Sequence, residues 1–260
     1  MTFRRVLVTT VTAYICAVLL NAIFLSADSA DASWTKKDSF HIYLLIGQSN
    51  MAGRAAIEAE DEAPIERCYL LNDHNEWEVA TNPLNRYSRY RKVMDMQRLN
   101  PGYGFAKKLV SSVPGITVGL VVSARGGTKV EQWQPGELLY EEAVARARIA
   151  AESGVLKGIL WHQGEGNRDD PDYLAKVTRV IEGFRRDLGV PDLPFIAGQI
   201  RTNEDWAVNR QISALTGEVP HTACVGAEGL VTQDDWHFET ESMRAFGERY
   251  ADAVIEMLYR

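Results

Sequence analysis

Short apolar runs alternate along the chain with longer segments whose apolar residues recur at helical spacing. The apolar runs, rich in Val, Ile and Leu, predict strands at residues 42–46, 68–71, 116–123, 155–161, 195–200 and 223–225. The spaced segments predict amphipathic helices at residues 104–113, 136–152, 171–188, 205–216 and 241–258. Continuous apolar strands separated by such helices indicate an α/β fold, in which helices cover both faces of a central parallel sheet.

Two long polar segments interrupt this alternation. Residues 54–67 include an acidic run, and residues 72–103 are polar and rich in Arg and Tyr. Loops of this length in a compact domain are usually functional or disordered. We therefore expect these segments to form walls of a ligand cleft.

The first 32 residues have the pattern of an export signal. Arg4 and Arg5 form a basic start, an apolar stretch follows, and Ala30-Asp31-Ala32 gives an A-x-A cleavage site. We expect residues 1–32 to be a signal peptide and residues 33–260 to be a single α/β domain. The apolar stretch is also about as long as a membrane span, so an uncleaved anchor is the alternative. Both interpretations predict an extracytoplasmic location, periplasmic or secreted.

Charge and cysteine content narrow the range of partners. The net charge is −7, and residues 1–32 carry two charges of each sign, so cleavage leaves it unchanged. An acidic chain argues against a nucleic-acid partner, since phosphate binding needs a basic face. Cys68 and Cys224 remain after cleavage; they could form a disulfide or stay free thiols. The five histidines are scattered, so we predict no metal site.

Polar clusters follow the ends of most of the predicted strands. In an open parallel sheet, ligands bind outside the carboxyl ends of the strands. Their common placement therefore favours one shared site over several unrelated turns. The clusters are Gln48-Ser49-Asn50, Arg125-Gly126-Gly127-Thr128, His162-Gln163-Gly164-Glu165, the pair Gln199 and Arg201, and Asp234-Asp235-Trp236-His237.

These clusters contain the parts of a serine hydrolase. A serine hydroxyl is a weak nucleophile and needs a base to remove its proton. Ser49 is the candidate nucleophile and His237 the candidate base. Asp234 could accept the other ring N–H of the histidine and fix its tautomer, with Asp235 as the rival.

Acyl transfer also needs hydrogen-bond donors directed at the developing oxyanion. The candidates are the main-chain N–H of Ser49, an N–H of the turn at Gly126 and Gly127, and the side-chain amide of Gln163. We expect Gln48, Asn50 and Glu165 to support the site. His162 could be catalytic or a core residue, and Trp133 and Trp236 could be sugar platforms or packing residues.

Four motifs in this order resemble the SGNH/GDSL hydrolase superfamily. Within it, the chain is similar to the sialate O-acetylesterase and plant-type acetyl xylan esterase group, carbohydrate esterase family 6. The likeness extends from about His41 to Leu258. The motifs are Gly47-Gln48-Ser49-Asn50-Met51, Arg125-Gly126-Gly127-Thr128, Trp161-His162-Gln163-Gly164-Glu165 and Asp234-x-x-His237-Phe238.

The resemblance implies a flavodoxin-like three-layer α/β/α fold and removal of O-acetyl groups from carbohydrates without a cofactor. It makes Ser49 the nucleophile, His237 the base and Asp234 its orienting acid, and it puts Gln163 where relatives often carry an oxyanion asparagine. Either Gly126 or Gly127 would complete the oxyanion hole. Two positions depart from the family pattern: Asn167 stands where an aspartate is frequent, and Asp235 where a glycine is common.

The resemblance leaves two rival functions and one open structural question. The rivals are a catalytically silent carbohydrate-binding protein on the same fold, and a lipase or thioesterase of the same superfamily. Long acyl chains would need an apolar groove, whereas the long loops here are polar. The sequence does not indicate an oligomeric state or a particular acetylated glycan.

Overall fold

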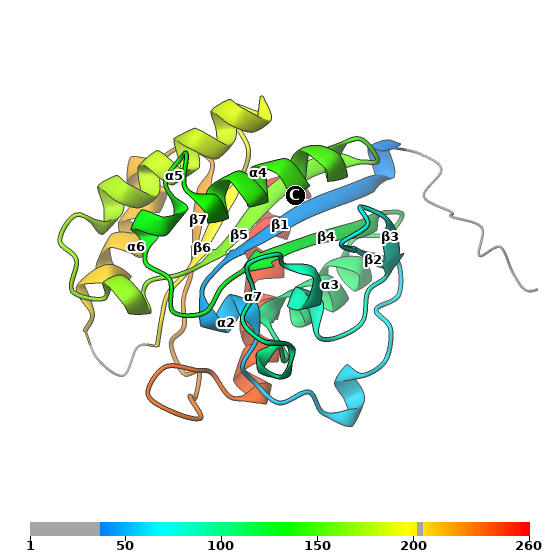
Figure 1. Cartoon of the computed structure of the whole chain (residues 1–260), viewed down its shortest axis with the longest axis horizontal. Helices are drawn as coiled ribbons and strands as arrows, with labels where there is room; N and C mark the ends of the chain where they lie inside the picture. The colour runs from blue at the N-terminus through cyan, green and yellow to red at the C-terminus, as the bar shows by residue number, and fades with distance from the viewer. Residues whose placement is uncertain (1–36, 202–204) are drawn as a thin grey trace, which may run out of the picture. The chain divides into compact units, whose positions relative to one another are not determined.

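A single central sheet organises the described part of the chain. The computed structural model describes residues 37–201 and 205–260, which belong to one compact unit. The expected signal segment, residues 1–32, lies outside the described residues and stays a prediction. The sheet has seven strands in the order β3-β2-β4-β1-β5-β6-β7, as Figure 1 shows. The strands are β1 (Phe40–Gly47), β2 (Cys68–Leu71), β3 (Trp77–Val79), β4 (Thr117–Ala124), β5 (Val155–His162), β6 (Phe195–Gly198) and β7 (Thr222–Val225).

Strand β1 lies at the centre of the sheet and pairs in parallel with β4 and β5 along most of its length. All eight of its residues are buried, which explains why its sequence is apolar rather than alternating. Only β3 runs antiparallel, on the edge beside β2. The hydrophobic pattern missed β3 because its three residues are partly exposed and carry no apolar run.

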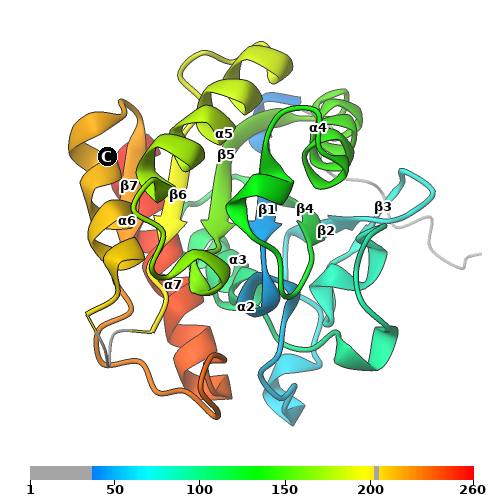
Figure 2. The ribbon, with the colours of Figure 1, turned by 60° about the vertical axis from the view of Figure 1, so that its left-hand side comes forward.

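Helices cover both faces of the sheet (Figures 1 and 2). Helices α3 (Pro101–Ser112) and α7 (Thr240–Leu258) pack against each other on one face. Helices α4 (Leu138–Ala151) and α5 (Tyr173–Leu188) lie on the other, and α6 (Ala207–Glu218) contacts α5 and β7. The α/β fold expected from the sequence is therefore confirmed, with a seven-stranded, mostly parallel sheet.

The largest difference from a predicted helix boundary is at the start of α3, and the other helix ends differ by at most two residues. Helix α3 begins at Pro101, three residues before the predicted start at residue 104. The Asn100 side chain accepts a hydrogen bond from the Gly102 N–H at 2.9 Å and caps the helix. The initial Pro-Gly-Tyr-Gly sequence hides this start, because glycine and proline are poor helix formers by propensity.

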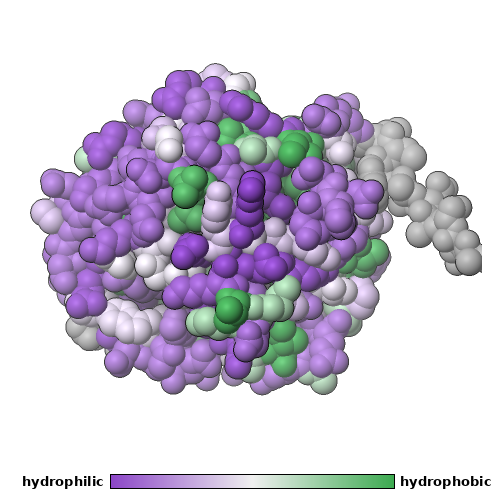
Figure 3. Space-filling view, in the orientation of Figure 1, coloured by the Kyte–Doolittle hydropathy of each residue, from purple (hydrophilic) through white to green (hydrophobic). Residues whose placement is uncertain are grey.

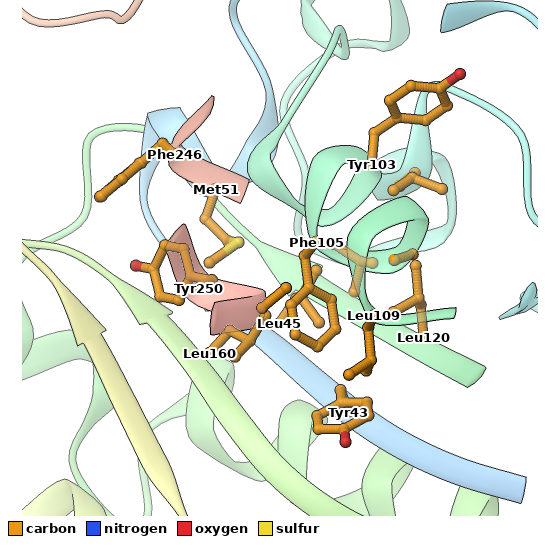
Figure 4. Packing of buried hydrophobic residues seen from close by; sticks show 14 of the residues in the cluster. Tyr43, Leu45, Met51, Tyr103, Phe105, Leu109, Leu120, Leu160, Phe246 and Tyr250 are labelled. Carbon is orange, nitrogen blue, oxygen red and sulfur yellow. The ribbon is translucent and has the colours of Figure 1, made fainter. Parts of the chain in front are cut away.

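The core on one face forms where α3 and α7 meet the central strands. Figure 4 shows Phe105 and Leu109 of α3 packed over Tyr43 and Leu45 of β1. The Tyr43 and Phe105 rings meet edge to face with centroids 5.0 Å apart. This contact lets alternate residues of β1 bury their side chains against α3.

The two helices approach closely because glycines line their contact. A Cβ at Gly104 would overlap the Arg244 carbonyl oxygen, and a Cβ at Gly247 would overlap that of Pro101. The absence of side chains at both positions therefore sets the distance between α3 and α7.

Cys68 and Cys224 are free thiols, which resolves the question left open by the sequence. Cys68 lies in β2 and Cys224 in β7, with β4, β1, β5 and β6 between them. With neighbouring strands about 4.8 Å apart, this separation exceeds the Cα spacing of under about 7 Å that a disulfide needs.

The face of the molecule in Figure 3 is mostly hydrophilic and shows only small, separate apolar patches. Within residues 37–201 and 205–260, no helix is both long and apolar enough to span a membrane. The large apolar residues exposed in these ranges are Val79, Val93, Met94, Met96, Leu138 and Val231.

The glycine contact between α3 and α7 predicts a steep cost for one added methyl group. We expect Gly247→Ala to lower the free energy of unfolding by about 3 kcal/mol, because the backbones must separate to admit the Cβ. Gly217→Ala in α6 is the matched control: nothing lies within 4 Å of its Cβ position. That variant should be neutral or up to about 1 kcal/mol more stable. Urea unfolding measures both, and equal stabilities would contradict the prediction.

Candidate active site

Ser49 lies where β1 leaves the sheet. The strand ends at Gly47, whose φ of +139° is a conformation that side chains rarely allow. A Cβ at Gly47 would overlap the His162 carbonyl oxygen, and the next residue, Gln48, donates its N–H to that oxygen at 2.8 Å. The chain then turns into the short helix α2 (Ser49–Ala52), so Ser49 is its first residue. Its main-chain N–H therefore has no acceptor within the helix.

His237 and Asp234 are paired on the loop before α7. The His237 Nδ1 atom lies 2.8 Å from Asp234 Oδ2, and Asp234 Oδ1 accepts the N–H groups of Trp236 and His237 at 2.8 Å each. Burial alone would raise the pKa of Asp234, but these hydrogen bonds outweigh it and hold the pKa below its ordinary value. The carboxylate therefore stays ionised near neutral pH. Asp234 and not Asp235 is the acid beside His237.

Asn50 connects the turn at Gln48 and Ser49 (the serine turn) to the loop before α7 that carries Asp234 and His237 (the histidine loop). Its side-chain nitrogen donates to Glu165 Oε1 at 2.7 Å and to the Trp236 carbonyl at 3.0 Å. Its side-chain oxygen accepts the Phe238 N–H at 3.2 Å. Asn50 is completely buried, so these bonds form away from water and fix the loop relative to the turn.

His162 and Glu165 lie beneath this connection. His162 is fully buried, and its Nε2 atom is 3.3 Å from Glu165 Oε1. Burial would raise the pKa of Glu165, but the neighbouring His162 and the hydrogen bond from Asn50 lower it below the ordinary value. His162 does not line the cavity beside Ser49. Of the two roles that the sequence left open for it, the structure places it in the core.

Two arginines stack on Trp236, next to the histidine. The Arg168 and Arg201 guanidinium carbons lie 5.0 and 5.3 Å from the Trp236 ring centroid. These residues follow β5 and β6, so the stacking ties the histidine loop to two other turns. Trp133 is fully buried and donates its indole N–H to Thr128 Oγ1 at 3.1 Å. Trp133 is thus a packing residue, and the Trp236 ring is already in contact with cations.

Ser49 and His237 line one cavity of about 330 Å³ at the carboxyl ends of the strands. Among the residues described, no group of three or more His, Cys, Asp or Glu side chains could hold a metal ion. The cavity is lined by Gln48, Ser49, Arg54, Lys92, Met96, Gly126, Gly127, Lys129, Glu165, Gly166, Trp236 and His237.

The expected oxyanion donors differ in where they lie. A Cβ at Gly126 would be 3.4 Å from the Ser49 Cβ, so Gly126 is in contact range of the serine. Gly127, at a φ of +77°, has Lys92 as the neighbour of its Cβ position. Gln163 is fully buried and does not line the cavity. Its amide nitrogen donates to Asn167 Oδ1 at 2.8 Å and to main-chain and side-chain oxygens at 3.2 Å.

Gln48 is the residue that Gln163 holds in place. Its side-chain oxygen accepts from the Gln163 amide at 3.2 Å and from the Gly166 N–H at 3.3 Å. Gln48 itself lines the cavity. The structure thus places Gln163 behind Gln48 rather than beside the serine.

The sequence predicted cleft walls at residues 54–67 and 72–103, which contain Arg54 and Lys92, but it did not predict that basic residues meet in one cavity. Arg54, Lys92 and Lys129 come from three different segments and converge beside Ser49. Within the described ranges, none of the three has a carboxylate oxygen within 4 Å, whereas Arg86 of the same Arg/Tyr-rich loop pairs with Glu78. Arg54 follows the serine turn, Lys92 lies in a long loop, and Lys129 follows the turn at Gly126 and Gly127. These positions are the signal in the sequence that could have suggested them.

The contacts of Asn50 predict a large structural effect for its removal. Asn50→Ala should lower the free energy of unfolding by about 3 kcal/mol, because buried groups of Glu165 and the histidine loop lose their partners. Asp235→Ala, which removes an exposed side chain on the same loop, is the control and should change stability by less than about 0.5 kcal/mol. Chemical denaturation compares the two, and equal losses would refute the role of Asn50.

Comparison with known proteins identifies the family. Residues 39–256 match the family model described as carbohydrate esterase, sialic acid-specific acetylesterase. A probable carbohydrate esterase of Arabidopsis thaliana is 30% identical, over 82% of this chain and 90% of the plant protein.

Solved structures agree with this match. The X-ray structure of an Arabidopsis thaliana protein superposes with a TM-score of 0.74 at 30% identity, covering 83% of this chain and 98% of that one. A carbohydrate acetylesterase from Xanthomonas citri shares the fold, with a TM-score of 0.62 at 22% identity, covering 84% of this chain and 56% of that one. The chain belongs to the carbohydrate esterase, sialic acid-specific acetylesterase family, and it is a carboxylic ester hydrolase.

Proposed function

We propose that this enzyme removes O-acetyl groups from carbohydrates through an acetyl-enzyme formed on Ser49. The observation that carries the proposal is one cavity that contains Ser49 together with a histidine already paired to an ionised aspartate. Family membership supports an acetyl ester of a carbohydrate as the substrate.

The histidine–aspartate pair sets the direction of proton transfer. With its Nδ1–H donated to Asp234, His237 keeps Nε2 as the acceptor for the Ser49 proton. Ser49 Oγ attacks the acetyl carbonyl, and the sugar oxygen leaves with the proton from His237. Water, deprotonated by the same nitrogen, then releases acetate and regenerates the serine.

The oxyanion is held mainly by main-chain donors in this proposal. The proposed donors are the Ser49 N–H at the start of α2 and the N–H of Gly126, whose Cβ position is 3.4 Å from the Ser49 Cβ. Gln163 fits the role of a direct donor less well, because its amide hydrogens already point at buried acceptors. It acts through Gln48 instead, whose side chain lines the cavity.

Replacing the nucleophile tests the mechanism directly. Ser49→Ala should lower acetate release by on the order of a thousandfold or more, because no other group can form the acetyl-enzyme. Ser111→Ala, an exposed serine on α3, is the control and should keep wild-type activity. Acetate release from an acetylated glycan panel and from p-nitrophenyl acetate measures both. Equal rates for wild type and Ser49→Ala would exclude catalysis by Ser49, and no acetate release by wild type would favour the silent carbohydrate-binding protein.

The cations of the cavity support an acidic substrate. Arg54 is fixed by hydrogen bonds from Nη1 to the carbonyls of Gly53 at 2.7 Å and Met96 at 2.6 Å. Together with Lys92 and Lys129, it gives a local positive field beside Ser49 in an acidic chain. Such a field attracts anions, and a carboxylate on the acetylated sugar would supply the missing partner.

A matched pair of substrates tests this preference. We expect kcat/KM to be higher for an O-acetylated methyl glucuronide than for the corresponding O-acetylated methyl glucoside. Lys92→Ala should lower the ratio of glucuronide to glucoside kcat/KM by about three- to tenfold, and added salt should also lower this ratio. Lys37→Ala, an exposed lysine before β1, should leave the ratio unchanged. A wild-type ratio at or below one would contradict the acidic-sugar proposal without touching the Ser49 mechanism.

A further inference from the structure

A second cavity of about 360 Å³ adjoins the one that contains Ser49. The two share Lys129, Glu165 and Gly166 as lining residues, so they are neighbouring parts of one groove. The second cavity is otherwise formed by Glu131 and by residues 167–170, which connect β5 to α5. Each cavity alone is near the lower end of the range of about 300–1,000 Å³ typical of ligand sites.

The floor of the second cavity is a preformed polar network. The Asn167 amide donates to Glu131 Oε2 at 3.1 Å and to Asp170 Oδ2 at 3.0 Å. Lys176 bridges the same two carboxylates at 2.7 and 2.6 Å. Burial alone would raise the pKa of Glu131 and of Asp170, but these partners hold both pKa values below the ordinary ones. Two carboxylates facing one ammonium leave the floor with one net negative charge, but both carboxylates already have partners, so the floor does not need a ligand to satisfy it.

The walls, in contrast, keep spare hydrogen-bonding capacity. Glu165 is more than nine-tenths buried; its Oε1 accepts from Asn50, while its Oε2 has no partner. The Lys129 ammonium has no carboxylate within 4 Å in the described part of the chain. The Asp169 carboxylate is 74% exposed and faces Arg168, with Nε and Oδ2 3.2 Å apart. Acceptors and donors thus stand together, which suits hydroxyl groups because each hydroxyl both donates and accepts.

The wall of the second cavity next to the histidine loop is rigid. Arg168 stacks on Trp206 at 5.2 Å and on Trp236 at 5.0 Å, so its guanidinium is fixed between two rings. Trp236 lines the cavity that contains Ser49, and Arg168 lines the second cavity. A ligand that spans both cavities would therefore meet surfaces held in place before it binds.

We propose that the second cavity is a subsite for the sugar unit attached to the acetylated one. It follows that the enzyme deacetylates oligosaccharides and polysaccharides better than free acetylated monosaccharides. This inference rests on the proposed esterase function and extends it to the length of the substrate. Binding energy from the second sugar then holds the acetyl ester against Ser49.

The test compares substrates that share one acetylated sugar. The probes are the O-acetylated methyl glucuronide and di- and trisaccharides in which xylose units are joined to the same acetylated glucuronic acid. We expect kcat/KM for the longer substrates to exceed that for the monosaccharide by about tenfold or more. Asp169→Ala should lower the ratio of disaccharide to monosaccharide kcat/KM by about tenfold, and Asp169→Asn, which keeps an acceptor oxygen, by less.

Asp172→Ala is the matched control. Asp172 is an exposed carboxylate three residues further along the same connection and lines neither cavity, so its removal should leave the ratio at the wild-type value. Thermal melting of all variants checks that the fold is kept. A wild-type ratio near one, or an unchanged ratio in Asp169→Ala, would overturn the subsite.

Hydrolysis of p-nitrophenyl acetate separates the two levels of inference. If wild type cleaves this ester but shows no preference for longer sugars, the subsite fails while the Ser49 chemistry stands. If it cleaves neither this ester nor any acetylated sugar, the proposed function fails and the subsite falls with it.

Discussion

The carboxamide of Asn50 is the interaction on which the geometry of the site depends. One side chain satisfies a carboxylate after β5, a carbonyl of the histidine loop and an N–H of the same loop. Because all of this happens in a fully buried position, each unmade bond would cost more than it would at the surface. Asn50 is therefore one neutral group that contacts the serine turn, the β5 turn and the loop before α7 together, in addition to the bonds of Gln48 and the stacking of Arg168.

The sheet explains why this bridge is possible. Strand β1 is central and parallel to both of its neighbours, so the turn that follows it lies between the turns that follow β4 and β5. Gly47 brings the backbone of the turn against His162, which places the next residues between these turns. A short polar side chain at position 50 then reaches both Glu165 and the loop that carries His237.

The fold and the order of the site motifs could be predicted from the sequence because both depend on local patterns. Continuous apolar runs predicted β1, β4 and β5 to within a few residues. The polar cluster after β1 pointed to Ser49, and the D-x-x-H spacing before the last helix pointed to Asp234 and His237. The edge strand β3 has no such run and could not be found in this way. Side-chain direction was also beyond reach: the pattern could not tell that Gln163 points away from Ser49 while Gln48 lines the cavity.

Contacts between segments that are far apart in the chain could not be predicted from the sequence either. The stacking of Arg168 and Arg201 on Trp236 joins three loops that are far apart in the chain. The basic lining was equally hidden, since Arg54, Lys92 and Lys129 share neither a motif nor a helix face. Such features depend on how loops fold back on the sheet, which periodicity does not encode.

The bridge made by Asn50 also has a kinetic meaning. Its bond to Phe238 closes a chain segment of 188 residues, so the entropy of loop closure must be overcome before that bond contributes anything. In general, contacts this distant in sequence are slow to form, because loop closure opposes them. A chain that had assembled β1, β4 and β5 but not docked α7 would hold Ser49 without His237. On the proposed mechanism, such a chain would not cleave esters.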